Sequence, residues 1–384
     1  MSSDKQSQEW GIETTAIHAG QSPDPITGAV TVPVYQTSTY QQDAVGQDRG
    51  YEYSRTGNPT RDALEKSISS LEGASYGRAF SSGMAAEDTI LRLLNPGDHI
   101  VMGNDAYGGT FRLISKVLTR FNIEWTAVDL SNSAQIRAAI NEKTRMLWTE
   151  TPSNPLLSIV DIEMLASIAH EQNALCVVDN TFATPYLQRP LSLGADFVVH
   201  SATKYLGGHS DVVGGFVAMN NCELDEQIAF LQNAIGAVPA PWDCYLLMRG
   251  FKTLPIRMVR HCENAEKIVD FLVAHKKVNK VLYPGLETHS THQIAMKQMK
   301  KYGGMVSFTV EGGEKAAHEI VSRTKIFTLA ESLGAVESLI EVPAAMTHLS
   351  AEGSPLEVDP SLIRLSVGIE TADDLLSDLE AALT

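Results

Sequence analysis

Two reactive side chains each follow an apolar run in the middle of the chain. Asp179 ends the run ALCVVD, and Lys204 comes four residues after the run DFVVH. Ligands bind beyond the carboxyl ends of strands in open parallel sheets, so both residues are candidates for one ligand site. An amine can form an imine with an aldehyde, and a carboxylate can keep a pyridine nitrogen protonated. Taken singly, a lysine is more often a surface residue, and an aspartate can simply cap a loop.

Hydroxyl groups and a helix start near these residues could bind a phosphate. Ser201 and Thr203 lie on the same side of an extended segment, where their hydroxyls can donate to phosphate oxygens. Ser82, Gly83 and Met84 stand at the start of an expected helix, whose free backbone amides favour a dianion. Helix capping by the serine explains that stretch equally well. These residues predict an α/β enzyme, and a phosphate-bearing cofactor is one hypothesis.

The segments that must position these residues alternate between short apolar runs and helical stretches. The apolar runs cover residues 99–103, 123–128, 145–150, 174–179 and 196–200. This alternation implies a mostly parallel sheet with helices on both faces. It also fits a nicotinamide-dependent dehydrogenase, but no GxGxxG follows an early strand. Upstream, Thr60 is expected to cap a helix that ends at Gly73.

Composition and pattern divide the chain into three parts. Residues 1–57 are rich in Gln, Thr, Pro and Gly and predict an extended arm that contacts a neighbouring subunit. Residues 58–250 are expected to form the large domain that carries the sheet. Residues 251–384 are expected to form a smaller mixed α/β domain, and residues 223–274 should be helical.

The charge and apolar content of the chain argue against several partners. A formal net charge of -16 and a pI near 5.1 disfavour nucleic acid and anionic membranes, which attract basic surfaces. No apolar run approaches the roughly 20 residues that a membrane helix needs, and the polar start of the chain does not resemble a secretion signal. The sequence therefore predicts a cytoplasmic protein.

Cysteine and histidine spacing predicts no metal site. The four cysteines lie far apart without a CxxC pair, so we expect reduced thiols rather than disulfides or a zinc ribbon. His289 and His292, in HSTH, are close enough to share a metal ion, but no third ligand is apparent. We interpret both as surface histidines.

Six motifs in combination resemble one enzyme family. They are YSRTGNPT, SSGMAA, TPSNP, VVDNTF, SATKYLGGHSDVVGG and AESLGAVESL. The sequence, from about residue 15 to residue 383, resembles the Cys/Met-metabolism family of pyridoxal-phosphate enzymes. The resemblance implies a fold-type I PLP-dependent transferase architecture like that of aspartate aminotransferase. It also implies a homotetramer, a dimer of dimers with active sites shared across each dimer.

The resemblance assigns cofactor contacts residue by residue. Lys204 would form the Schiff base with pyridoxal 5'-phosphate, and Asp179 would contact its pyridinium nitrogen. Tyr53 and Arg55, in the arm, would reach the phosphate bound by the partner subunit, because a guanidinium fork suits a phosphate. The remaining phosphate contacts would come from Ser82, Gly83, Met84, Ser201 and Thr203.

The resemblance also assigns ring and substrate contacts. Tyr107 matches an aromatic residue that stacks over the pyridine ring and can exchange a proton with the leaving group. Arg364 matches the arginine that binds the α-carboxylate of the substrate, and Asn154 would lie near that carboxylate and the 3-hydroxyl of the cofactor. Independently of any family, an arginine within the apolar strand IRLSV requires a partner, since an unpaired buried charge is costly.

The reaction depends on substrate contacts. Glu331, which precedes Ser332, matches an acidic residue typical of cystathionine γ-synthases and γ-lyases. Methionine γ-lyases usually carry an apolar residue there and a cysteine in place of Gly109, and enterobacterial β-lyases carry an aromatic residue at position 331. The resemblance thus favours transsulfuration in methionine and cysteine biosynthesis, with cysteine replacing the γ-substituent of an O-acylhomoserine to give cystathionine. Cleavage of cystathionine at its γ-carbon is the alternative; β-lyase, methionine γ-lyase and a non-catalytic PLP-binding regulator are less favoured.

Overall fold

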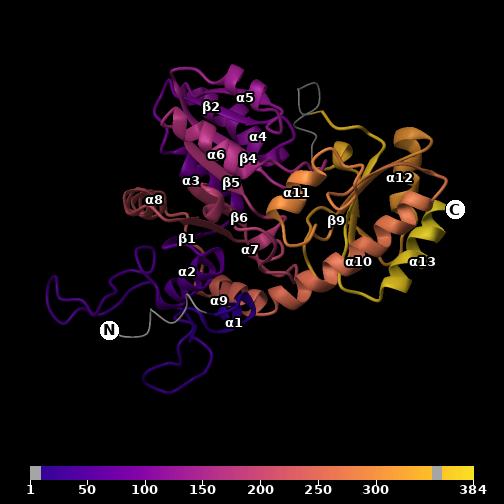
Figure 1. Ribbon diagram of the computed structural model, residues 1–384. Coiled ribbons are helices and arrows are strands. Elements are labelled where there is room, and N and C mark those ends of the chain that lie inside the picture. The colour runs from indigo at the N-terminus through magenta and orange to yellow at the C-terminus, as the bar shows by residue number, and fades with distance from the viewer. Residues whose placement is uncertain (1–9, 348–356) are drawn as a thin grey trace. The chain divides into compact units, whose positions relative to one another are not determined.

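The computed structural model describes residues 10–347 and 357–384 and divides into two compact units (Figure 1). Unit 1 combines the chain up to Leu93 with the segment Asp196–Pro255. Unit 2 combines Leu94–Ala195 with Ile256–Thr384. The first nine residues of the predicted arm lie outside the described residues. The domain boundaries that we expect at residues 57 and 250 stay a prediction.

Unit 1 contains three strands that pair in antiparallel fashion. Strand β7 pairs with both of the others, which are adjacent to it on either side. The strands are β1 (Tyr76–Phe80), β6 (Phe197–Ser201) and β7 (Gly215–Met219). The helices are α1 (Ile12–His18), α2 (Pro59–Glu72), α3 (Gly83–Leu91), α8 (Cys222–Ile235) and α9 (Pro241–Phe251). Helix α1 lies within the predicted extended arm, so the arm is not wholly extended.

Helix α2 begins at a different residue from the one that the sequence predicts. Asn58, rather than Thr60, caps the helix: its side-chain oxygen accepts hydrogen bonds from the amides of Thr60 and Arg61. The Thr60 hydroxyl instead donates to the carbonyl of Pro33, 2.9 Å away. Thr60 therefore ties the arm to the helix. Gly73 ends the helix in the left-handed conformation, with φ of 69°, and this part of the prediction is confirmed.

The first half of unit 2 is built on parallel strands, as the alternation of apolar and helical segments predicts. Strand β2 pairs with β3 and β4, and β4 pairs with β5, all parallel. The strands are β2 (His99–Gly103), β3 (Glu124–Val128), β4 (Thr144–Glu150) and β5 (Leu175–Asp179). The helices are α4 (Gly108–Arg112), α5 (Ser133–Ala139), α6 (Ile162–Glu171) and α7 (Thr184–Leu187). A π-helix covers Leu113–Val117, and short 3-10 helices cover Leu118–Phe121 and Pro190–Leu193. Apolar residues of α5 and α6 pack against these strands in one buried cluster.

The second half of unit 2 contains a five-stranded sheet in the order β10-β11-β12-β9-β8. Its pairs are antiparallel except β10 with β11. The strands are β8 (Val278–Leu282), β9 (Met305–Val310), β10 (Thr328–Leu329), β11 (Leu339–Glu341) and β12 (Leu362–Ser366). The helices are α10 (Leu254–Ala274), α11 (His292–Gln298), α12 (Gly313–Arg323) and α13 (Ala372–Leu383), with a turn at Pro343–Ala345. Residues of α10, α12 and α13 share one buried apolar cluster with the strands (Figure 1).

The helical prediction for residues 223–274 is confirmed by α8, α9 and α10. None of the helices in the described residues is both long and apolar enough to cross a membrane.

Candidate active site

Helix α3 of unit 1 begins at the predicted phosphate-binding residues. The Ser82 side chain accepts a hydrogen bond from the amide of Ala85, 3.0 Å away, and so caps the helix. The amides of Gly83 and Met84 lie in the first turn, where an α-helix provides no backbone acceptor for them. The capping hypothesis and the anion-binding hypothesis are therefore compatible, because the serine uses its side chain and the next two residues use their amides.

Two glycines let the start of α3 approach the ends of β6 and β7. A Cβ atom on Gly83 would lie 2.9 Å from the Cβ of Ser201, and one on Gly215 would lie 2.1 Å from the carbonyl oxygen of Ser82. Real Cβ atoms do not come so close, so a side chain at either position would push the start of α3 away from the ends of β6 and β7. We call Ser82, Gly83, Met84 and Ser201 the phosphate cradle. The sequence argument missed Gly215, although the VVGG of the lysine motif contained the signal.

Lys204 lies in a turn that follows directly on β6. Its amide donates to the carbonyl of Ser201, 3.1 Å away, and its own carbonyl accepts from the amide of Gly208 at 2.8 Å. The hydroxyl of Thr203 accepts from the amide of Gly214 at 3.1 Å, which ties the turn to the segment before β7. These contacts fix the backbone of the lysine beside the phosphate cradle within unit 1.

The predicted arm residues have exposed side chains in unit 1. Tyr53 retains 45% of its accessible surface, and the Arg55 guanidinium lies 5.6 Å from the centre of its ring. Arg55 Nη1 also donates to the backbone carbonyl of Asn233, 2.7 Å away, and to its side-chain oxygen at 3.0 Å. The contact of Tyr53 and Arg55 with a partner subunit stays a prediction.

Unit 2 holds the predicted carboxylate and aromatic residue. Asp179 ends β5, retains 7% of its accessible surface, and accepts a hydrogen bond from the amide of Thr181 at 2.8 Å. Glu150, its register neighbour in β4, accepts from the amide of Tyr107 at 3.0 Å. A Cβ atom on Gly109 would lie 2.4 Å from Cε1 of Tyr107, so the ring lies directly against this glycine. Gly109 therefore determines where the ring can lie.

Arg364 of unit 2 is buried at 2% exposure and has several partners. Its Nη1 donates to Asn154 Oδ1 at 2.8 Å and lies 3.0 Å from Glu341 Oε1. Its Nη2 donates to the carbonyl of Ser332 at 3.0 Å. The prediction that this arginine requires a partner is confirmed, and the partner, Glu341, is the residue opposite it in strand β11.

We call Arg364, Asn154, Glu341 and the Ser332 carbonyl the carboxylate clamp. The buried Nε of Arg364 has no hydrogen-bond acceptor in the part of the chain that the structure describes. A guanidinium held on one side by Glu341 and with a donor remaining suits a carboxylate ligand. Ser332 has φ of 98°, rare for a residue with a side chain, and Glu331 before it is exposed.

The donor sets fit the chemical groups of pyridoxal phosphate. Unit 1 offers helix-start amides and hydroxyls for a phosphate and the amine of Lys204 for an aldehyde. Gly83 lets these amides lie close to Ser201, because a Cβ atom at this position would collide with that residue. Unit 2 offers the buried Asp179 carboxylate for a pyridine nitrogen.

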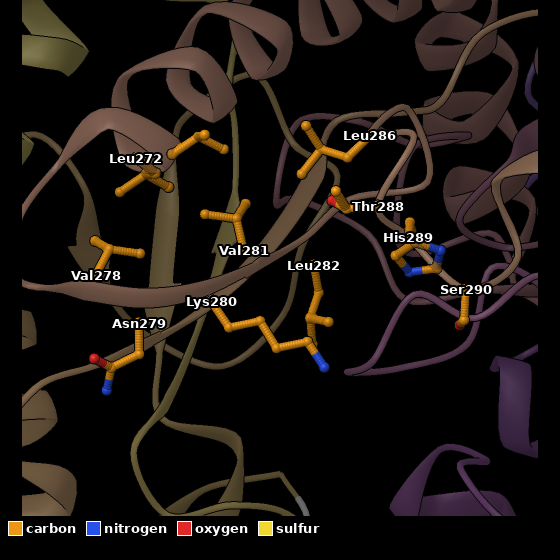
Figure 2. A pocket seen from close by; sticks show the side chains of 11 residues that line it. Leu272, Val278, Asn279, Lys280, Val281, Leu282, Leu286, Thr288, His289 and Ser290 are labelled. Atoms are coloured by element: carbon orange, nitrogen blue, oxygen red, sulfur yellow. The ribbon is translucent and has the colours of Figure 1, made fainter.

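Two cavities lie in unit 2. One, of about 280 Å³, is lined by Asn154 of the carboxylate clamp and by Asp105, Asp129 and Ser158. The other, of about 360 Å³, runs along the strand β8 and is lined by apolar side chains and by the polar residues Asn279, Lys280, Thr288, His289 and Ser290 (Figure 2). None of the predicted site residues lines this second cavity.

The interpretation of His289 and His292 as surface residues is wrong. They retain 9% and 7% of their accessible surface, and each has a hydrogen-bond partner within the protein. His292 Nδ1 lies 2.8 Å from the carbonyl of Pro284, and His289 Nδ1 lies 3.2 Å from the Thr291 hydroxyl. Among the described residues, no group of three or more His, Cys, Asp or Glu side chains could hold a metal ion. The four cysteines all lie in the described part of the chain, and none of them forms a disulfide.

Comparisons with known proteins agree on one family. The model of the Cys/Met metabolism PLP-dependent enzymes matches residues 13–384. Cystathionine gamma-synthase of Mycobacterium tuberculosis (strain ATCC 25618 / H37Rv) is 58% identical over 375 residues, 97% of each chain. Cystathionine beta-lyase of Lactococcus lactis subsp. cremoris (strain MG1363) is 56% identical over 97% of this chain and 98% of the relative. The crystal structure of cystathionine gamma-lyase from Lactobacillus plantarum complexed with L-serine matches with a TM-score of 0.93 and 49% identity, over 97% of this chain and 98% of that chain.

The chain belongs to the family of Cys/Met metabolism PLP-dependent enzymes. It is an enzyme that uses pyridoxal phosphate and acts on small-molecule substrates, and its fold is that of the fold-type I enzymes. The predictions of family, cofactor, enzyme class and fold class are confirmed.

Proposed function

We propose that the enzyme catalyses γ-replacement, in which the thiol of cysteine displaces the acyloxy group from the γ-carbon of an O-acylhomoserine, forming cystathionine and releasing the carboxylic acid. The observation that carries this proposal is the carboxylate clamp with Glu331 beside it. Arg364 donates to the carbonyl of Ser332, the residue that follows Glu331 in the chain. A substrate bound by its α-carboxylate at Arg364 would thus have an exposed acidic group near it, suited to the ammonium of a second amino acid.

Each predicted residue has a task in this reaction. When bound, pyridoxal phosphate supplies an electron-withdrawing ring that stabilises negative charge on the carbon beside the substrate nitrogen. The Asp179 carboxylate holds a proton on the pyridine nitrogen, and Lys204 removes and returns protons at the α- and β-carbons. Tyr107 exchanges a proton with the group that leaves from the γ-carbon.

The remaining residues bind rather than react. The phosphate cradle, with Thr203, binds the phosphate, and Asn154 orients the substrate carboxylate on Arg364. We further propose that Tyr53 and Arg55 bind the phosphate of a partner subunit in a homotetramer with active sites shared across each dimer. Exposed apolar side chains such as Ile26 and Val30, at 88% and 81% exposure in the arm, support a surface that a second copy covers. Three of the four cysteines are buried and none of the four forms a disulfide, which supports a cytoplasmic location.

The domain division at residues 57 and 250 belongs to the same proposal. Limited proteolysis of the holoenzyme, with the fragments identified by mass, is expected to cut near these positions first. Sedimentation of the holoenzyme is expected to give the mass of four chains, and that of one chain would contradict the assembly.

The test of the reaction uses purified holoenzyme and mass-resolved products. O-Succinylhomoserine or O-acetylhomoserine is supplied with cysteine in one reaction, and cystathionine alone in another. Cystathionine formation is expected to dominate, and Lys204→Ala is expected to lower turnover by at least about a thousandfold, because both proton transfers depend on the amine. If the enzyme mainly breaks down cystathionine to cysteine, a 2-oxo acid and ammonia, the synthase proposal is wrong.

Cystathionine γ-lyase is the second candidate, because Glu331 fits it equally well. A lyase also needs an acidic group beside the clamp to pair with the second ammonium of cystathionine. The same assay separates the two, since the lyase forms its products without any acylated homoserine.

A further inference from the structure

A buried arginine lies beneath the exposed arm segment of unit 1. Arg61, in the first turn of α2, retains 2% of its accessible surface. Its guanidinium donates to three consecutive backbone carbonyls, with Nη1 2.7 Å from Ser54 O and Nη2 3.2 Å from Arg55 O and 3.0 Å from Thr56 O. The carbonyls of the segment thus point inward to Arg61, and the side chain of Arg55 is exposed.

Glu65, one helical turn further along α2, links this arginine to strand β1. Arg61 Nε lies 3.7 Å from Glu65 Oε1, and the same carboxylate oxygen accepts from the amide of Ala79 at 2.8 Å. Both side chains are buried, so water does not weaken the interaction between them as it would at the surface. Strand β1 ends at Phe80, two residues before Ser82 of the phosphate cradle. The arm is therefore connected to the strand that leads into the phosphate cradle.

Helix α8 contacts both ends of this connection, strand β1 and the side chain of Arg55. Gln232 Nε2 donates to the carbonyl of Ala79 at 2.6 Å, and the next residue, Asn233, accepts the Arg55 guanidinium. Arg55 is thus held at its backbone by Arg61 and at its side chain by Asn233. An exposed arm segment would otherwise sample many conformations, each of which would place the Arg55 guanidinium differently.

We propose that Arg61, supported by Glu65, is a positioning residue that presents Arg55 to the phosphate of the partner subunit. Arg61 does not contact the cofactor itself; it acts through Arg55. The inference rests on the proposed function, which assigns Arg55 to that phosphate.

The experiment compares variants of the full chain by their dissociation constant for pyridoxal phosphate, measured by absorbance when the apoenzyme is titrated. Arg55→Met should weaken cofactor binding by about 10- to 100-fold, the usual cost of a lost charged hydrogen bond. Arg61→Met should weaken it by a similar factor and expose residues 37–57 to faster proteolysis. Arg61→Lys should recover only part of the affinity, because one ammonium cannot hold three carbonyls as a planar fork does. The control is Arg49→Met, an exposed arginine of the same arm, which should change neither readout.

The double variant Arg55→Met, Arg61→Met separates positioning from general stabilisation. If Arg61 acts through Arg55, the double variant binds the cofactor no more weakly than Arg55→Met alone. If the two losses multiply, or if Arg61→Met binds like wild type while Arg55→Met does not, the inference is wrong. An Arg55→Met enzyme with unchanged affinity would instead contradict the role of the arm in the proposed function.

Asn233→Ala provides a second test of the inference if Arg61→Met fails to fold. This substitution removes the side-chain contact of Asn233 with the Arg55 guanidinium, while the contact with the backbone carbonyl of residue 233 and the carbonyl contacts of Arg61 remain. A cofactor affinity that is weaker by about 3- to 10-fold, the usual cost of one ordinary hydrogen bond, would support the inference that these contacts position Arg55. Unchanged affinity in both Asn233→Ala and Arg61→Lys would overturn it.

Discussion

Two buried arginine–glutamate pairs, Arg61–Glu65 in unit 1 and Arg364–Glu341 in unit 2, use the same side chains differently. The closest charged atoms lie 3.7 Å apart in the first pair and 3.0 Å apart in the second. Arg61 donates to three backbone carbonyls, whereas Arg364 donates to one carbonyl and to the side chain of Asn154.

The partners of each arginine indicate its use. Carbonyls of consecutive residues fix the path of a segment, so the contacts of Arg61 anchor the arm. The partners of Arg364 come from elements that are distant in the chain, and they orient its guanidinium without using all its donors. A buried charge is costly without partners, so Arg364 requires Glu341, whereas Arg61 is stabilised by three carbonyls together with Glu65. The comparison shows that the other hydrogen-bond partners of a buried arginine, rather than its glutamate, indicate whether it anchors a backbone segment or binds a ligand.

The largest expected effect concerns the arginine that is assigned to recognition. Arg364→Met removes the carboxylate contact and leaves Glu341 buried without its counter-charge. We expect kcat/KM for the acylated homoserine to fall by about a thousandfold, as for a lost charge-assisted pair in a buried site. Steady-state kinetics of the holoenzyme measure this, with cofactor absorbance as a control for loading. A fall of less than about tenfold would mean that Arg364 is a structural arginine like Arg61.

A smaller effect is expected at Glu341, which acts through Arg364. Glu341→Gln keeps the shape and one acceptor but removes the charge, so the guanidinium can turn away from Asn154. We expect KM to rise by about 10- to 100-fold while kcat changes by less than about threefold, because only binding of the carboxylate is affected. Glu311→Gln, at an exposed position, is the matched control. Equal losses in kcat and KM would show that Glu341 does more than orient Arg364.

A third effect concerns the aromatic residue near the leaving group. In Gly109→Ala the new methyl group would lie 2.4 Å from the Tyr107 ring, so the ring must move. We expect kcat to fall by about tenfold, since a small misplacement of a reacting group is costly. Gly11→Ala is the control, because its Cβ would meet only the Glu13 carboxylate, at 3.5 Å. Unchanged kcat would show that Tyr107 takes no part in proton exchange and would weaken its assignment.

Residues close in sequence were predictable, and contacts between distant segments were not. The apolar runs before Asp179 and Lys204 predicted both strands, because a strand that is buried on both faces is continuously apolar. Strand β1 was missed because Arg78 interrupts its pattern, and the structure pairs that arginine with Asp225 at 2.6 Å. Nothing local in the sequence connects Glu341 to Arg364, or Arg364 to Asn154 across 210 residues. Only the folded register brings these side chains together.

The last expected effect concerns stability rather than turnover and distinguishes the two glutamates by their surroundings. Burial raises the pKa of Glu65 from its ordinary value of 4.5 to about 7, although Arg61 and Arg78 oppose the shift and Asp62 adds to it slightly. Because the raised pKa belongs to the folded protein, the folded chain keeps a proton that the unfolded chain releases above about pH 4.5. The free energy of unfolding therefore falls as the pH rises from about 5 to about 7, and the stabilisation is present in full only below that window.

Glu65→Gln tests this assignment because an amide stays neutral throughout. Thermal unfolding midpoints of the apoenzyme at pH 5 to 8 should fall with pH more steeply in the wild type than in Glu65→Gln. The difference in free energy of unfolding between the two proteins should change by on the order of 2 kcal/mol across this pH range. Glu52→Gln, at an exposed arm position, should follow the wild type. A constant difference across these pH values would mean that Glu65 is ionised throughout. The Arg61–Glu65 pair would then be a true ion pair like Arg364–Glu341, and only the neighbours of each arginine would distinguish the two regions.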